Sequence, residues 1–168
     1  AVKAIREGRE PALEKPLRSG VEVDLKVAAL IPDEFLPDVP ARLELYKRIA
    51  SAKNPEQLED IRIEMVDRFG TLPLPVHNLI RQGHLRVRAK QLGLSRISAG
   101  EKGGKIEFGP STPVEPIKLI QLVQKLPMRY RLDGADSLKI VQDCPTEDSR
   151  FELLDSLFEL IEPDKATA

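Results

Sequence analysis

Apolar and charged residues alternate strictly near the start of the chain. From Val21 to Val27 every odd position is apolar and every even one is charged, which is the period of a strand with one buried face. The proline-rich residues 31–38 follow and predict a connection, because proline continues neither helix nor sheet. Residues 1–20 show no sustained period, so we expect a helix end and a linker there, continuing from a preceding domain.

Three helices are predicted next, because apolar residues recur at helical spacing between recognisable ends. Their expected ranges are 40–52, 55–69 and 75–93. The second has the clearest limits, since Asn54 is a natural N-cap, Pro55 suits the first helical position and Gly70 suits the residue that closes a helix.

The remainder of the chain is predicted to contain two successive strand-strand-helix units. In the first unit the helix is expected to be capped at Thr112. The expected strands are 94–99, 105–108, 128–132 and 138–142, and the expected helices are 112–126 and 146–162. We therefore predict an α+β fold in which an N-terminal strand and three helices precede two hairpins that share a small sheet with helices on its face. Residues 21–162 would form a single domain, and residues 163–168 a disordered tail.

Composition argues against an enzyme. The 168 residues include two histidines, one cysteine and no tryptophan, too few for a nucleophile with its base or for a zinc site. We expect no catalytic residue, no metal and no cofactor, although a small hydrolase is kept as a competing hypothesis. The single Cys144 is typical of a reducing, cytoplasmic location, and no apolar run reaches the roughly 20 residues that span a membrane.

The net charge of −1 conceals two opposite segments. Residues 68–100 contain basic residues and no acidic one, whereas residues 143–164 are strongly acidic. The basic stretch 81–96 could contact nucleic acid, but it has no aromatic residue on which bases could stack. It could equally face the acidic C-terminal helix or water. Its candidate nucleic-acid contacts are Arg81, Arg86, Arg88 and Lys90.

A strip of mixed charge is predicted on the second helix, at Asp60, Glu64, Asp67 and Arg68. Glu64 and Arg68 are four residues apart, a spacing that gives an exposed helical ion pair worth about 0.2–0.5 kcal/mol. The same strip could instead be a docking patch, in which both signs of charge meet complementary residues of a partner. The pattern alone leaves both interpretations open.

Several short motifs follow one another in a characteristic order between about Val21 and Ile161. They are Ile31-Pro32-Asp33, Arg42, Leu45-Tyr46-Lys47-Arg48-Ile49-Ala50, Glu64, Asp67-Arg68-Phe69-Gly70, Leu72-Pro73 and Glu101-Lys102-Gly103-Gly104. This ordered set resembles the C-terminal (TRCF) domain of the bacterial transcription-repair coupling factors, the Mfd family. Residues 1–11 resemble the tail of the helix that follows the motor in that family, so we expect a fragment of a longer protein.

The resemblance implies a regulatory, autoinhibitory domain without chemistry of its own. In that family the full protein is an ATP-dependent DNA translocase that removes stalled RNA polymerase at DNA lesions and recruits UvrA for nucleotide excision repair; ATP and Mg²⁺ act in its motor domains. The C-terminal domain docks on the UvrB-like N-terminal module, masks UvrA binding and restrains the motor. The family's docking residues fall on Glu64, Asp67 and Arg68 of this chain.

Overall fold

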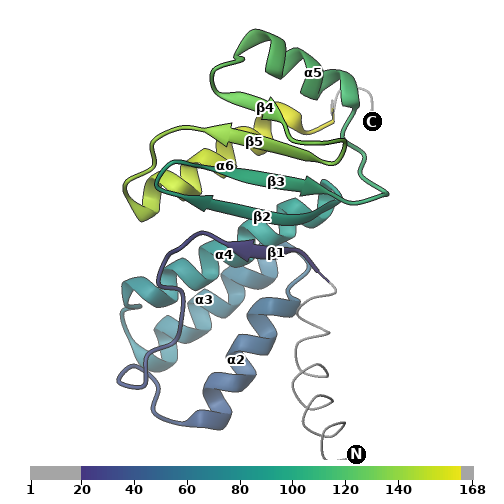
Figure 1. The fold of residues 1–168 in the computed structure, drawn as a ribbon. Coiled ribbons are helices and arrows are strands. Elements are labelled where there is room, and N and C mark those ends of the chain that lie inside the picture. The colour runs from purple at the N-terminus through teal and green to yellow at the C-terminus, as the bar shows by residue number, and fades with distance from the viewer. Residues whose placement is uncertain (1–19, 164–168) are drawn as a thin grey trace, which may run out of the picture.

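One mixed sheet holds both predicted hairpins and the N-terminal strand (Figure 1). The computed structural model describes residues 20–163, so the expected linker before Gly20 and the tail after Pro163 lie outside the described residues. The strands are β1 (Glu22–Asp24), β2 (Leu94–Gly100), β3 (Gly103–Phe108), β4 (Tyr130–Leu132) and β5 (Ser137–Val141). Their order is β1-β2-β3-β5-β4, with β1 parallel to β2 and the other pairs antiparallel. The predicted α+β class and the shared sheet are confirmed.

The first strand is shorter than predicted. Pairing with β2 stops at Asp24 instead of continuing to Val27, because Lys26 adopts a left-handed backbone conformation with φ of 55°. The carbonyls of Leu25 and Lys26 then accept hydrogen bonds from the buried side chain of Arg150, at 3.4 and 2.9 Å. The alternating pattern therefore continues past the end of the strand into a turn that is fixed by a distant helix.

Three helices form a bundle next to the sheet: α2 (Val39–Ser51), α3 (Pro55–Phe69) and α4 (Leu74–Gln91). The predicted ends of α3 are confirmed, since Asn54 Oδ1 accepts from the Gln57 backbone N–H at 2.9 Å and Gly70 follows with φ of 93°. A glycine allows α3 and α4 to approach closely. A Cβ at Gly83 would lie 2.9 Å from Leu58 Cδ2, shorter than ordinary packing permits.

The last two helices are α5 (Pro116–Lys125) and α6 (Glu147–Ile161). The predicted cap at Thr112 is wrong, because Pro116 keeps the preceding residue, Glu115, extended and delays the helix. Thr112 Oγ1 instead donates to the Leu92 carbonyl at 2.6 Å. α6 begins as predicted, with a reciprocal capping box between Thr146 and Ser149.

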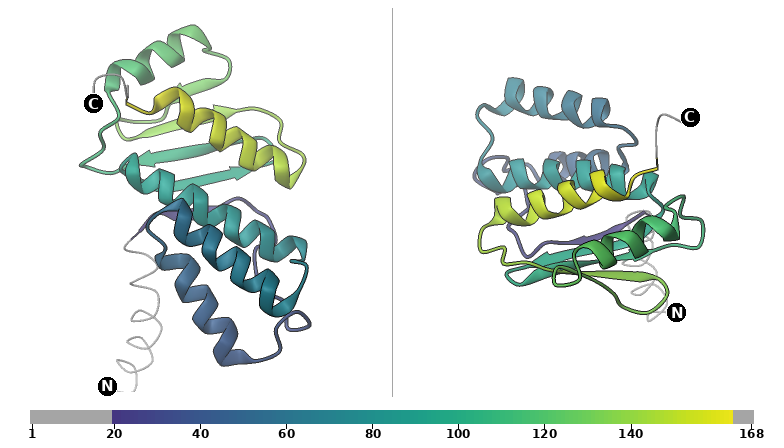
Figure 2. Two further views of the ribbon diagram at one scale, coloured as in Figure 1. Left: turned by 180° about the vertical axis from the view of Figure 1, so that it is seen from behind. Right: turned by 90° about the horizontal axis from the view of Figure 1, so that it is seen from above.

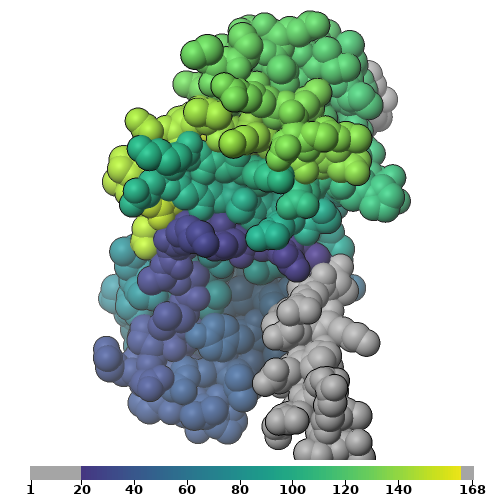
Figure 3. Space-filling model, in the orientation of Figure 1, coloured from purple at the N-terminus to yellow at the C-terminus, as the bar shows by residue number. Residues whose placement is uncertain are grey.

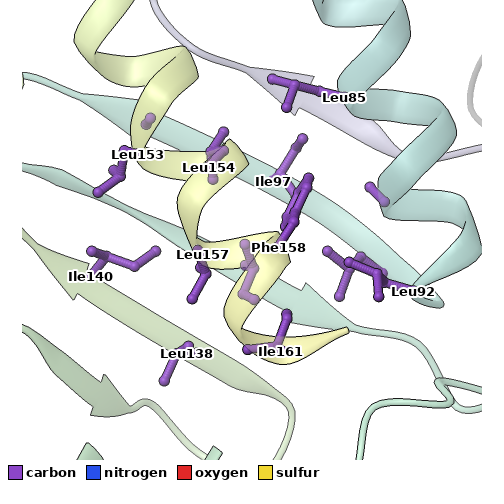
Figure 4. Packing of buried hydrophobic residues seen from close by; sticks show 14 of the residues in the cluster. Leu85, Leu92, Ile97, Leu138, Ile140, Leu153, Leu154, Leu157, Phe158 and Ile161 are labelled. Carbon is purple, nitrogen blue, oxygen red and sulfur yellow. The ribbon is translucent and has the colours of Figure 1, made fainter. Parts of the chain in front are cut away.

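Helices α4 and α6 cover one face of the sheet, and α5 lies beside the edge strand β4 (Figure 2). The apolar face of α6 packs on the central strands, with Leu154, Leu157 and Phe158 completely buried (Figure 4). A second apolar cluster fills the bundle of α2, α3 and α4. α4 contributes to both clusters, through Leu85 to the first and Ile80 to the second, and so joins the bundle to the sheet. No helix in residues 20–163 is long and apolar enough to cross a bilayer.

Candidate docking surface

Glu64 of α3 lies between two arginines, one from each helix of the α2–α3 pair. Arg48, near the end of α2, donates from Nη1 to Oε2 at 2.8 Å and from Nη2 to Oε1 at 2.9 Å. This is the bidentate geometry that makes arginine–carboxylate pairs strong and directional. Arg68, one turn further along α3, donates from Nη1 to Oε2 at 3.0 Å. The helical ion pair predicted between Glu64 and Arg68 is thus confirmed, within a larger network.

The network fixes the charge of Glu64. The hydrogen bonds from Arg48 lower the pKa of Glu64 most, burial opposes them and Arg68 adds to the lowering, so that the pKa falls from 4.5 to about 2. The hydrogen bond to Glu64 likewise raises the pKa of Arg48. The three groups therefore present an alternating pattern of positive, negative and positive charge at any physiological pH.

Arg68 is held from a second side by an aromatic contact. Its guanidinium carbon lies 4.8 Å from the centre of the Phe69 ring, within the range of a cation–π interaction. Phe69 in turn packs edge-on against Phe35, with the ring centres 5.7 Å apart. The connection before α2 therefore supports the position of an α3 side chain, although 53% of the Arg68 side chain remains exposed.

Two acidic residues of α3 lie next to the Arg48–Glu64–Arg68 network and take no part in its hydrogen bonds. Asp67 is exposed and forms no ion pair or side-chain hydrogen bond with any residue in the range 20–163. Asp60, two turns earlier on α3, lines a shallow hollow of about 270 Å³ together with Arg48. We refer to Arg48, Asp60, Glu64, Asp67 and Arg68 as the α2–α3 charged surface.

Four members of the α2–α3 charged surface are predicted from the sequence, but no role is predicted for the fifth, Arg48. Arg48 and Glu64 are 16 residues apart, and no helical spacing rule connects residues on different helices. The available signal was the basic residue in the last turn of α2, which is equally typical of a side chain that interacts with the helix dipole. The contact depends on how α2 crosses α3.

The basic helix largely faces the acidic C-terminal helix. Arg81 donates to Asp148 Oδ1 at 2.6 Å, and its guanidinium carbon lies 4.1 Å from the centre of the Phe151 ring. Arg88 lies 3.4 Å from Glu162 and 3.8 Å from Asp155. Two basic residues of α4 therefore pair with the acidic C-terminal segment, which is one of the alternatives that the sequence pattern left open.

The other two candidate nucleic-acid contacts lie elsewhere. Arg86 Nε donates to the Val21 carbonyl at 3.4 Å, and burial lowers the pKa of its guanidinium. Lys90 is exposed and has no ion pair with the described residues. Because Arg81, Arg86 and Arg88 are engaged by the protein itself, the structure does not gather the four residues into one free basic surface.

The few reactive side chains are not brought together. Cys144 is completely buried, and burial raises the pKa of its thiol. Burial also lowers the pKa of His84, against smaller opposing effects of Glu59 and Asp155. Within the described part of the chain, no group of three or more histidine, cysteine, aspartate or glutamate residues could hold a metal ion.

Comparison with known proteins identifies the family to which this chain belongs. Residues 25–119, which include α2, α3 and α4, match the family described as the TRCF domain. The chain belongs to the TRCF domain family. The expected resemblance to transcription-repair coupling factors is thereby confirmed.

Relatives of this TRCF domain are much longer proteins. The transcription-repair-coupling factor of Escherichia coli is 47% identical over 152 residues, which are 90% of this chain and 13% of that protein. The Haemophilus influenzae protein of the same name is 43% identical over 161 residues, or 96% of this chain and 14% of that protein. A crystal structure of the C-terminal domain of transcription-repair coupling factor shares the fold, with a TM-score of 0.67 at 21% identity, over 84% of this chain and 94% of that one.

Proposed function

We propose that this TRCF domain is a regulatory docking module of a transcription-repair coupling factor. Its α2–α3 charged surface would bind the UvrB-like N-terminal module of the same full-length protein. In the docked state it would mask the UvrA-binding surface and restrain the ATP-dependent DNA translocase that removes stalled RNA polymerase at lesions in the cytoplasm. The domain would act by binding alone, without catalysis.

The observation that carries this proposal is the ordered arrangement of charges on the α2–α3 charged surface. Arg48 and Arg68 hold Glu64 in one geometry, while Asp67 has no partner among the described residues. A preorganised surface of both signs favours selective docking, because electrostatic complementarity sets register and specificity more than affinity. Preorganisation also lowers the entropy cost of ordering side chains on contact.

We propose that ATP and Mg²⁺ act in the motor domains of the full-length protein and not in this domain. The proposal is supported by the glycine-rich segment 101–105, which forms the β2–β3 turn and the first residues of β3. The contribution of this domain to their use would be indirect, through the docked state.

Docking within one chain needs little intrinsic affinity. A tether raises the effective concentration of the two modules to the millimolar range for short flexible connections, so even a polar interface can keep the docked state populated. Engagement of RNA polymerase would need to supply about 5.5 kcal/mol to move a 99:1 population to 1:99. A small, ion-paired surface is suited to such a switch because it can be released.

The test is a charge reversal in the full-length protein. Asp67→Arg is the cleanest variant, because the side chain has no partner among the described residues whose loss could unfold the domain. Glu64→Arg is a second variant that places three arginines together. Both are expected to raise basal ATPase activity and UvrA binding several-fold. The matched control is Glu152→Arg, which reverses an exposed charge on α6 and is expected to change neither.

Two results would contradict the proposal. One is wild-type ATPase activity and UvrA binding in an Asp67→Arg protein that retains the circular dichroism spectrum of the wild type. The other is an equal activation by Glu152→Arg, which would show that net charge, and not this surface, controls the motor.

A further inference from the structure

The face of the sheet opposite α4 and α6 carries three cations in a row. Lys105 of β3 is paired in register with Lys139 of β5, and Lys139 is paired with Arg131 of β4. Their strand neighbours Ile106, Leu138 and Tyr130 are buried in the core. Since successive side chains point to opposite faces, the three cations point away from the helices. Figures 1 and 3 show that none of the helices in residues 20–163 covers β2, β3 and β5 on this side.

The fold gives no reason for this row. Like charges directly opposite each other on neighbouring strands are destabilising. The adjacent row on the same face alternates instead, with Arg96 between Glu22 and Glu107 at 3.9 and 4.0 Å. Charges of opposite sign thus face each other in the row that contains Arg96. The row of Lys105, Lys139 and Arg131 differs from it because all three side chains are positive.

Little within the described residues compensates the row. Asp133, in the β4–β5 turn, pairs with Lys105 at 3.0 Å, and Lys105 and then Lys139 lower the pKa of Asp133. Lys139 and Arg131 are exposed and form no ion pair with a residue in the range 20–163. Arg129 is also exposed, and its carbonyl accepts from the Val141 backbone N–H at 2.7 Å, which extends the β4–β5 pairing next to the row. The patch thus has a surplus of positive charge.

The spacing and composition of the patch select a type of partner. Neighbouring strands lie about 4.8 Å apart, so the row spans about 10 Å across β3, β5 and β4. A nucleic-acid duplex carries one negative charge per ~1.7 Å of its axis, and thus offers several phosphates to such a row. The outward positions of β2, β3, β4 and β5 hold no aromatic side chain, which excludes base stacking as the mode of contact.

We propose that the row of Lys105, Lys139 and Arg131 binds the phosphate backbone of duplex nucleic acid without reading its sequence. The site lies on the sheet and shares no residue with the α2–α3 charged surface. It also differs from the basic stretch of α4, whose arginines contact Asp148 of α6, the adjoining Glu162 and the Val21 carbonyl just before β1. Its test is therefore independent of the docking proposal.

The test measures binding of a fluorescein-labelled 20-base-pair DNA duplex to the 168-residue chain by anisotropy, over a series of salt concentrations. Three phosphate contacts predict a slope of log K against log[salt] of about −2.7, or a roughly 40-fold loss of affinity between 50 and 200 mM salt. The variant Lys105→Gln/Arg131→Gln/Lys139→Gln is expected to bind about tenfold or more weakly at 50 mM salt, with a slope close to zero.

The matched control is Lys47→Gln/Lys53→Gln/Lys90→Gln, which removes the same charge at exposed positions of the helical bundle. It is expected to keep the wild-type slope. The proposal is overturned if the wild-type chain does not bind the duplex at 50 mM salt, or if the control loses as much affinity as the sheet variant. It is also overturned if poly-L-glutamate displaces the duplex at equal charge concentration, because the row would then fit an acidic protein surface equally well.

Discussion

Glu64 shows how one side chain combines a structural and a recognition role. Its two oxygens accept from Arg48 and Arg68, so the carboxylate joins α2 to α3 and also orients both guanidinium groups toward the surface. The Glu64–Arg68 pair follows from a spacing of four residues on one helix, and the sequence predicted it. The pair with Arg48 could not be predicted, because it depends on the packing of two helices whose relative position is set by buried residues such as Leu58 and Ile49.

Replacement of Glu64 by glutamine tests this network through pH. The folded-state pKa of Glu64, about 2, lies below the ordinary value of 4.5, so its stabilisation is fully present above pH 4.5 and is lost as the pH falls toward 2. The side chain is 35% exposed, and screening by solvent limits the effect to about 1 kcal/mol. Urea unfolding should show Glu64→Gln less stable by about this amount at pH 7, and the difference should shrink at pH 3. A difference that stays constant across this range would contradict the assigned pKa.

At the scale of elements, a buried arginine connects the first strand to the last helix. Arg150 of α6 is 7% exposed and donates to the carbonyls of Cys144, Leu25 and Lys26. Beside it, Glu147 accepts from the Ala28 backbone N–H and from Asn78 of α4. These contacts end β1 at Asp24. No local sequence pattern predicts this role of Arg150, because hydrogen bonds to carbonyls more than 100 residues away follow no spacing rule.

Removal of this arginine should destabilise the whole domain. Arg150→Met keeps much of the side-chain volume but leaves buried carbonyls without their donor, which we expect to cost roughly 3 kcal/mol. Arg62→Met is the control, since Arg62 forms only an exposed ion pair with Glu59 and its loss should leave the stability nearly unchanged. Thermal and urea unfolding of the two variants measure the contrast. Equal stability of the two would show that Arg150 does not hold the turn after β1.

At the scale of the whole molecule, the two proposed surfaces lie in different layers. The α2–α3 charged surface lies on the helical bundle, and the basic row lies on the sheet. In Figure 1 the bundle is at the bottom and the sheet is above it. The sequence predicted both hairpins and most helix ends because each depends on local periodicity and capping. It could not predict that β3 pairs with β5, and so could not place Lys105 beside Lys139. The basic row is for this reason visible only in the folded chain.

The structure shows where the charges that sum to −1 are located. Acidic residues of α6 and the adjoining Glu162 pair with Arg81 and Arg88 of α4. The remaining surface charges include the mixed-sign α2–α3 charged surface on the helical bundle and the basic row on the sheet. A net charge near zero is not typical of a dedicated nucleic-acid-binding domain, whereas the arrangement of the charges permits a local basic site.

Isothermal titration calorimetry can measure the affinity of this 168-residue chain for the separately purified UvrB-like module of the same full-length protein. We expect the wild-type chain to bind with an affinity that weakens with salt. The affinity should fall by about tenfold or more in Asp67→Arg, equivalent to 1.4 kcal/mol, and stay unchanged in Glu152→Arg. An absence of wild-type binding at low salt, or equal binding by wild type and Asp67→Arg, would contradict the claim that the α2–α3 charged surface is the docking site.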